Sequence, residues 1–196
     1  MTTLIGLSGS LRRGSFNTAL LRAAATLMPA HATLAIHTLH DIPLYDADLE
    51  SSAGLPDSVS ALKEAIVAAD GVLLATPEYN NGIPGVFKNA IDWLSRPASD
   101  IPRVFGGKPV GLIGASPGGF GTILSQAAWL PVLRVLGARH WPGGRVLASR
   151  AGQAFDANGA LQDPKLREQL QEYLRNFVGY VREVSAARGS PARSQP

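Results

Sequence analysis

Short apolar runs alternate along the chain with longer stretches in which apolar residues recur at helical spacing. The short runs have the length of buried β-strands, and the longer stretches have the period of amphipathic helices. The predicted strands cover residues 3–8, 33–39, 71–76 and 109–115, with a fifth within residues 139–147. Because strands and helical patterns alternate, the sequence predicts an α/β fold with a parallel sheet and helices on both faces.

The predicted helices cover residues 17–28, 57–69, 86–94 and 122–136, and a last helix begins at residue 164. Asp57 is expected to cap the second of these helices. Asp163 followed by Pro164 predicts the N-cap and the first position of the last helix, whose apolar stripe runs to Val184. We see no repeat and no linker, so we expect one domain over residues 1–187 and a disordered tail over residues 188–196.

Five strands with intervening helices fit the doubly wound, five-stranded order of flavodoxin-like proteins better than a six-stranded dinucleotide-binding fold. In such sheets the ligand lies beyond the carboxyl ends of the strands. The predicted site is therefore made by the loops after the first, third and fourth strands, which are residues 9–18, 76–85 and 115–121.

Composition narrows the classes of function. The chain has 196 residues, 45% of them hydrophobic, and no cysteine, which excludes disulfides, thiolate metal sites and a thiol nucleophile. The formal net charge is +3 and the sequence pI is near 9.5, but the basic residues are scattered, so no nucleic-acid partner is expected. No signal peptide is recognisable and no apolar run approaches the ~20 residues of a membrane span, so we expect a cytoplasmic protein with no membrane partner.

The first loop, with the sequence GSLRRGSFNT, concentrates groups that bind anions. The hydroxyls of Ser10 and Ser15, the amide of Asn17, the guanidinium of Arg12 and a helix N-terminus all favour a phosphate group. The alternative is an ordinary turn in which Ser15 or Asn17 only caps the helix.

Two more specific phosphate motifs do not match this loop. Gly9 and Gly14 have the spacing of a nucleotide P-loop, but Ser15 stands where that motif requires lysine. Gly6, Gly9 and Gly14 also do not fit the G-x-G-x-x-G pattern of dinucleotide-binding folds. A single phosphate therefore suits the loop better than a pyrophosphate.

The second loop, TPEYNNGIPG, contains two prolines and two glycines, so we expect a rigid turn whose backbone approaches a ligand closely. Its backbone amides, the amide of Asn80 and the ring of Tyr79 are suited to a flat ligand with polar edges. Glu78 by itself is more typical of a helix cap or a surface carboxylate than of an acid catalyst.

The third loop, ASPGGFG, overlaps the G-x-S-x-G pattern of serine hydrolases. A hydrolase is excluded because Pro117 has no N–H for an oxyanion hole, and no acidic residue lies between Pro117 and His140. The better interpretation is a glycine-rich cradle for the other edge of a flat ligand.

The helix predicted over residues 122–136 has almost no polar face, although a helix on the outside of a sheet should have one. We therefore expect a homodimer or a larger assembly; the alternative is that adjacent loops and the last helix cover the apolar side. His37, His40 and Asp41 have no third ligand at a suitable spacing, so no metal site is expected.

Three stretches, GSLRRGSFN, PEYNNGIPGVFKNAIDWLSR and SPGGFG, resemble in order and spacing the NADPH-dependent FMN reductase family, which includes bacterial quinone and chromate reductases. The resemblance runs from Thr2 to Val184 and implies a flavodoxin-like domain that binds FMN. It places the phosphate and ribityl end of FMN on Ser10, Arg12, Ser15, Phe16, Asn17 and Thr18. It places the isoalloxazine against Pro77, Glu78, Tyr79, Asn80 and Asn81, with Ser116, Gly118 and Gly119 at its other edge.

The resemblance also implies the chemistry. FMN carries the hydride, so no catalytic side chain is expected. NAD(P)H and an acceptor such as a quinone, a flavin, an azo compound or chromate would use one site in turn, in a ping-pong scheme. The apolar helix over residues 122–136 is the reason to expect a homodimer or homotetramer. Two alternatives stay open: a flavodoxin-like electron carrier without NAD(P)H activity, and a phosphate-binding α/β enzyme without flavin.

Overall fold

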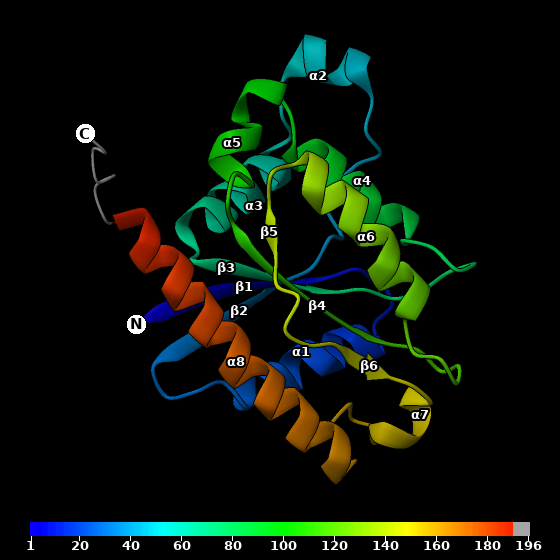
Figure 1. Cartoon of the computed structure of the whole chain (residues 1–196). Coiled ribbons are helices and arrows are strands. Elements are labelled where there is room, and N and C mark those ends of the chain that lie inside the picture. Colours follow the sequence, from blue (N-terminus) through cyan, green and yellow to red (C-terminus); the bar gives the residue numbers. More distant parts are fainter. Residues whose placement is uncertain (190–196) are drawn as a thin grey trace.

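The computed structural model describes residues 1–189, and a parallel sheet forms its centre (Figure 1). The strands follow the order β2-β1-β3-β4-β5, and β6 also pairs with β4. The strand bounds are β1 Thr2–Ser8, β2 Ala32–His37, β3 Gly71–Ala75, β4 Pro109–Ala115, β5 Arg139–His140 and β6 Val146–Ala148. This is the flavodoxin-like order, so the predicted α/β fold is confirmed.

The predicted fifth strand is divided into two pieces. β5 pairs with the start of β4, at Pro109 and Val110, whereas β6 pairs with its end, from Ile113 to Ala115. Pro142 and two glycines separate the pieces. Proline has no N–H to donate to a neighbouring strand and glycine weakens a strand, so the ladder is interrupted there.

Helices cover both faces of the sheet, as predicted. Their bounds are α1 Phe16–Thr26, α2 Ala47–Ala53, α3 Asp57–Ala68, α4 Gly85–Leu94, the 3₁₀ helix η1 Ala98–Asp100, α5 Ile101–Val104, α6 Ile123–Val135, α7 Ala151–Ala154 and α8 Pro164–Gly189. Figure 1 shows α1 and α8 on one side of the sheet and α3, α4 and α6 on the other. Each side has its own hydrophobic core, one with Leu20 and Leu174 among its members and the other with Ile66 and Leu133.

The helix ends test the predicted caps. Asp163 caps α8 as predicted, because its Oδ1 accepts hydrogen bonds from the N–H groups of Lys165 at 2.9 Å and Leu166 at 3.2 Å. Asp57 is not the N-cap of α3: the cap is Pro56, and Asp57 is the first helical residue. An acidic residue is still favourable there, because the first turn carries the positive end of the helix dipole.

The short helices α2, α5 and α7 were not predicted, because four to seven residues are too few to show a helical period. α8 continues to Gly189, beyond the predicted start of the tail at Arg188. Residues 190–196 of that predicted tail lie outside the described residues.

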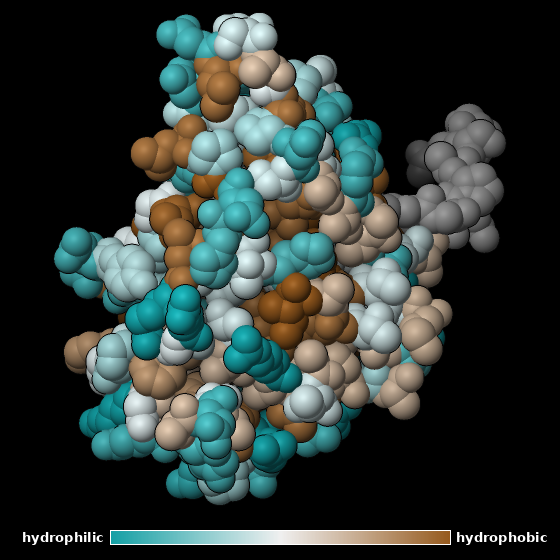
Figure 2. All heavy atoms as spheres, turned by 180° about the vertical axis from the view of Figure 1, so that it is seen from behind, coloured by the Kyte–Doolittle hydropathy of each residue, from teal (hydrophilic) through white to brown (hydrophobic). Residues whose placement is uncertain are grey.

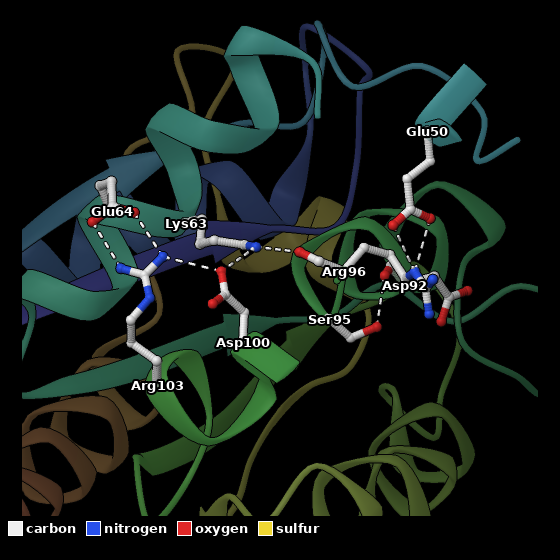
Figure 3. A network of polar contacts seen from close by, with 8 residues as sticks. All are labelled: Glu50, Lys63, Glu64, Asp92, Ser95, Arg96, Asp100 and Arg103. Atoms are coloured by element: carbon white, nitrogen blue, oxygen red, sulfur yellow. Dashed lines mark hydrogen bonds and ion pairs between the residues drawn. The ribbon is translucent and has the colours of Figure 1, made fainter. Parts of the chain in front are cut away.

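A buried lysine ties α3 to the segment after α4 (Figure 3). The ammonium of Lys63 donates to the carbonyl of Arg96 and to Asp100 Oδ2, the latter at 3.0 Å. Arg103 also donates to Asp100 and pairs with both oxygens of Glu64 at 2.8 and 3.0 Å. Because Lys63 is only 1% exposed, these partners replace the water that its charge loses on burial.

Candidate active site

The amino end of α1 follows the carboxyl end of β1, and the first loop gathers hydrogen-bond donors there. Ser10 and Ser15 are buried, and Ser15 is the N-cap of α1, with its Oγ accepting from the N–H of Thr18 at 3.3 Å. The amides of Phe16 and Asn17 are the first of the helix, so they have no acceptor within it. These donors and the helix dipole favour an anion in front of α1.

Arg12 adds a positive charge at the same place. Its guanidinium lies over the ring of Phe16, 5.3 Å from the centroid. Within residues 1–189 this guanidinium has no carboxylate partner. It is therefore available to pair with a phosphate group.

Two predicted residues of this loop use their side chains inside the protein. The amide of Asn17 donates to the carbonyl of Ala115 and accepts from its N–H, both at 2.9 Å. The hydroxyl of Thr18 bonds that of Ser8 at 2.7 Å. These contacts fix α1 against β4 and β1, so what Asn17 offers a ligand is its backbone N–H.

Gly9 is needed where the loop leaves β1. A Cβ at this position would lie 2.2 Å from Phe87 Cδ1 and 2.8 Å from Pro77 Cδ. Both distances are far shorter than van der Waals contact, so a larger residue would push the first loop away from the second. Glycine thus permits the close approach of the two loops that form the site.

The second loop contains a tight two-residue turn. Asn80 and Asn81 have φ angles of 49° and 62°, and the N–H groups of Tyr79 and Gly82 each bond the other residue's carbonyl. Positive φ at both central positions is typical of a type I′ turn, which asparagine tolerates well. The turn points outward, so Asn80 and Asn81 are exposed and Tyr79 is 56% exposed.

Glu78 caps a helix that begins after the third loop. Its Oε2 accepts from the N–H of Leu124 at 2.8 Å and of Ser125 at 2.9 Å, in the first turn of α6. The side chain of the α6 N-cap, Thr122, accepts no hydrogen bond from the first amides of the helix. Glu78 therefore replaces the usual local cap and holds the second loop against the end of the third.

The third loop is anchored to the segment between β6 and α7. Ser116 donates its N–H to the carbonyl of Ala148 and accepts from the N–H of Ala151, both at 3.0 Å, and Gly118 accepts from the N–H of Arg150 at 2.9 Å. The Ser116 hydroxyl accepts from the Gly118 N–H at 3.1 Å. These bonds fix the third loop to the residues that link β6 to α7.

The three loops line one cavity of about 140 Å³ at the carboxyl edge of the sheet. The predicted residues that line it are Ser10, Arg12, Ser15, Phe16, Asn17, Pro77, Glu78, Tyr79 and Ser116. The predicted residues that do not line it are Thr18, Asn80, Asn81, Gly118 and Gly119. Ala115 and Pro117 line it as well; the only signal for them was their position beside Ser116, because neither side chain carries a polar group.

This cavity is smaller than the ~300–1,000 Å³ of most small-molecule sites, so it encloses only one end of a larger ligand. Its lining combines the donors at the start of α1 with Tyr79, which is largely exposed, and with residues of the second and third loops. This donor set fits the phosphate group of the FMN that the resemblance implies.

No group of three His, Asp or Glu side chains suited to a metal ion occurs among residues 1–189. His40 instead places Nε2 2.9 Å from the carbonyl oxygen of Leu11 in the first loop. Over the same residues, no helix combines the length and the apolar character required to cross a membrane.

Comparisons with known proteins agree with this geometry. Residues 2–153 match the model of the family described as NADPH-dependent FMN reductase. An NAD(P)H-dependent FMN reductase of Pseudomonas aeruginosa is 42% identical over 181 residues, which cover 92% of this chain and 96% of that protein. A 2-hydroxy-1,4-benzoquinone reductase of a Burkholderia species is 37% identical over 175 residues, covering 89% of this chain and 93% of that protein.

A solved structure leads to the same family. FerB of Paracoccus denitrificans, a flavoenzyme NAD(P)H:acceptor oxidoreductase, aligns with a TM-score of 0.81 and 36% identity over 93% of this chain and 98% of its own. These relatives favour the reductase over both the electron carrier and the enzyme without flavin. The chain belongs to the NADPH-dependent FMN reductase family, and is therefore an oxidoreductase with FMN as its cofactor and NAD(P)H as its electron donor.

Proposed function

We propose that this enzyme reduces quinones with electrons from NAD(P)H. The observation that carries the proposal is the cavity at the meeting point of three loops, whose lining combines the donors at the start of α1 with the exposed Tyr79. The 37% identity to a 2-hydroxy-1,4-benzoquinone reductase supports a quinone as the acceptor. Bound FMN supplies the hydride chemistry, and the protein supplies binding, orientation and access.

The residues divide into two roles in this proposal. Ser10, Arg12, Ser15 and the first amides of α1 bind the phosphate. The turn at Tyr79 and the loop at Ser116 flank the ring and leave one side open to substrates. Glu78 holds the two loops together, since its carboxylate is already bonded by the amides of α6.

An anaerobic titration followed by absorption tests the proposal. The purified enzyme should show a flavin spectrum that bleaches when NADPH is added and returns when 2-hydroxy-1,4-benzoquinone is added. A flavin spectrum that persists with both NADPH and NADH would contradict reductase activity. A protein that takes up no FMN would contradict the assigned site. The reduced flavin of the enzyme should be reoxidised more slowly by free flavin, an azo compound or chromate than by the quinone.

We also propose a ping-pong mechanism, in which the donor and the acceptor use the same side of the flavin ring in turn. The donor must then leave before the acceptor binds. Initial rates measured at several fixed quinone concentrations should give parallel double-reciprocal lines. Intersecting lines would show that both substrates bind together and would contradict the ping-pong mechanism.

A third proposal is that α6 joins two copies of the chain, as the smallest form of the expected homodimer or homotetramer. Its buried side includes the polar Ser125 and Gln126. Ser125 bonds the hydroxyl of Thr76 at 2.8 Å, and Gln126 donates to the carbonyl of Val146 at 3.0 Å. The exposed large apolar residues of α6 are Ile123, Leu124, Leu130 and Val135.

The last helix does not cover this apolar side of α6. α8 packs on the opposite face of the sheet, together with α1 (Figure 1). Figure 2 shows the molecule from behind, where hydrophilic and hydrophobic residues are mixed, as is common on surfaces that face water. A second copy is the proposed occupant of the α6 surface, because a symmetric dimer would bury the same apolar stripe on both subunits.

Sedimentation velocity tests the dimer. The wild-type chain should sediment as a dimer or tetramer, and Val135→Glu, at a position that is 79% exposed, should shift it towards the monomer. Ala61→Glu is the matched control on the exposed side of α3 and should leave the assembly unchanged. A wild-type monomer at micromolar concentration would contradict the proposal.

The cytoplasmic location stays a prediction.

A further inference from the structure

A second cavity lies on the other side of Arg12 and Phe16 from the first. Its volume is about 470 Å³. Arg12, Ser15 and Phe16 line both cavities, so the two are neighbours across this ridge. We call the second one the arginine cavity, because Arg12, Arg13 and Arg22 all line it.

The positive charge of this cavity is not neutralised within the described part of the chain. Arg13 and Arg22 are exposed, and neither side chain has an ion pair or hydrogen bond to residues 1–189. Arg12 contacts only the ring of Phe16 with its guanidinium. Arg12 is assigned to the FMN phosphate, but Arg13 and Arg22 line the same hollow and have no such role, so they are available to pair with a second phosphate.

The one carboxylate that lines the cavity is engaged by its own turn. Asp156 Oδ1 accepts from the N–H groups of Asn158 at 2.9 Å and Ala160 at 2.8 Å, and Oδ2 accepts from Gln162 at 3.2 Å. Asp156 therefore organises the turn that forms one wall of the cavity and does not pair with the arginines.

The cavity also has an aromatic wall. The rings of Phe16 and Phe155 are stacked, with centroids 6.0 Å apart and planes inclined by 26°. Gly152 lies next to them, and a Cβ there would meet Phe16 at 4.0 Å. A flat apolar ring can pack against such a wall while a phosphate pairs with the arginines. The combination points to a nucleoside phosphate.

We propose that the arginine cavity binds the adenosine 2′-phosphate end of NADPH, with Arg13 and Arg22 pairing with the phosphate and the Phe16–Phe155 wall contacting the adenine. This inference rests on the proposed function and adds the choice of donor. NADH lacks the 2′-phosphate, so it gains nothing from these arginines. Because the two cavities adjoin, one dinucleotide reaches from the flavin, past Arg12, into the arginine cavity.

Isothermal titration of the FMN-loaded enzyme tests this site without turnover. The probes are adenosine 2′,5′-bisphosphate, which carries the 2′-phosphate, and adenosine 5′-monophosphate, which does not. The bisphosphate should bind at least about tenfold more tightly, and Arg13→Ala and Arg22→Ala should each weaken it about tenfold. Arg175→Ala removes an exposed arginine of α8 outside this cavity and should bind the bisphosphate as the wild type does.

Kinetics provides a second readout. In Arg13→Ala and Arg22→Ala, the ratio of kcat/KM for NADPH to that for NADH should fall about tenfold. Equal affinity for the two nucleotides, or a bisphosphate affinity and a kcat/KM ratio that neither variant changes, would overturn the inference. If NADPH still bleaches the flavin in that case, the proposed function stands and only the arginine cavity is refuted. If no donor bleaches the flavin, the proposed function fails, and the titration still decides whether the cavity binds the 2′-phosphate.

Discussion

Arg12 lies on the ridge between the two cavities, with its guanidinium 5.3 Å from the centroid of the Phe16 ring. The contact with the ring holds the charge beside the enclosed phosphate donors while leaving its N–H groups for a ligand. Ser10, by contrast, is buried and contributes a neutral hydroxyl. The site therefore combines the positive charge of Arg12, which attracts a phosphate from a distance, with neutral donors that act only in direct contact.

Arg12→Ala should therefore weaken FMN binding by about 1.5–3 kcal/mol, since a hydrogen bond to a charged group is lost. Fluorescence titration of the apoprotein with FMN measures the change. Arg175→Ala is the control for loss of one positive charge. If Arg12→Ala binds FMN as tightly as the control, the phosphate lies elsewhere.

Among the elements, the second loop and α6 depend on one another through Glu78. The side chain of the α6 N-cap does not bond the first amides of the helix, and Glu78 supplies their acceptor from a different loop. The first amides of a helix need such a partner when they are not open to water. Glu78 thus stabilises α6 and also sets the distance between two walls of the cavity.

Glu78→Ala should lower the free energy of unfolding by about 1–3 kcal/mol, because two amides of α6 lose their acceptor. It should weaken FMN binding as well, since the loops are no longer held together. Urea unfolding and FMN titration measure the two effects. Glu168→Ala removes an exposed carboxylate of α8 and serves as control. A Glu78→Ala variant with wild-type values in both measurements would refute the role of this carboxylate.

Over the whole molecule, carboxylates and cations join segments that are distant in the chain (Figure 3). Arg96 bonds both oxygens of Glu50 and so attaches α2 to the end of α4, at 2.8 and 3.1 Å. The hydrogen bond from Arg96 lowers the pKa of Glu50, and that from Arg103 lowers the pKa of Glu64. Lys63, followed by Arg103, lowers the pKa of Asp100.

The lowered pKa values of these three carboxyl groups predict how the stability of the fold depends on pH. A carboxyl whose pKa is lower in the folded state contributes stability above its ordinary pKa and loses it as the pH falls through the folded pKa. The ordinary values are 3.8 for Asp100 and 4.5 for Glu64, so the melting temperature should begin to fall below about pH 4.5.

Asp100→Asn should make that fall shallower, because one of the responding carboxyls is gone. Thermal unfolding followed by circular dichroism between pH 3 and pH 7 measures it, with Glu168→Gln as the control outside the network. Parallel curves for the wild type and Asp100→Asn would mean that this network does not respond to acid.

Much of the fold and part of the site follow from short-range patterns. The apolar runs of β1, β3 and β4, the cap at Asp163 and the tight turn of the second loop each depend on residues that are close in sequence. The carboxyl-edge rule then brings three loops together, and the cavity lies where they meet. These features could be predicted because periodicity, capping and turn chemistry are local.

The tertiary structure alone decided which of the predicted residues line the cavity and which polar side chains are bonded inside the protein. Asn17 has the same polar amide in either role, but its partner, Ala115, is 98 residues away. The partner of Glu78 lies in α6. The hydroxyl of Ser125, also in α6, is buried because it bonds the hydroxyl of Thr76. The arginine cavity likewise joins the start of α1 to the turn after α7. Such pairings depend on packing between segments remote in sequence, and no local pattern carries that information.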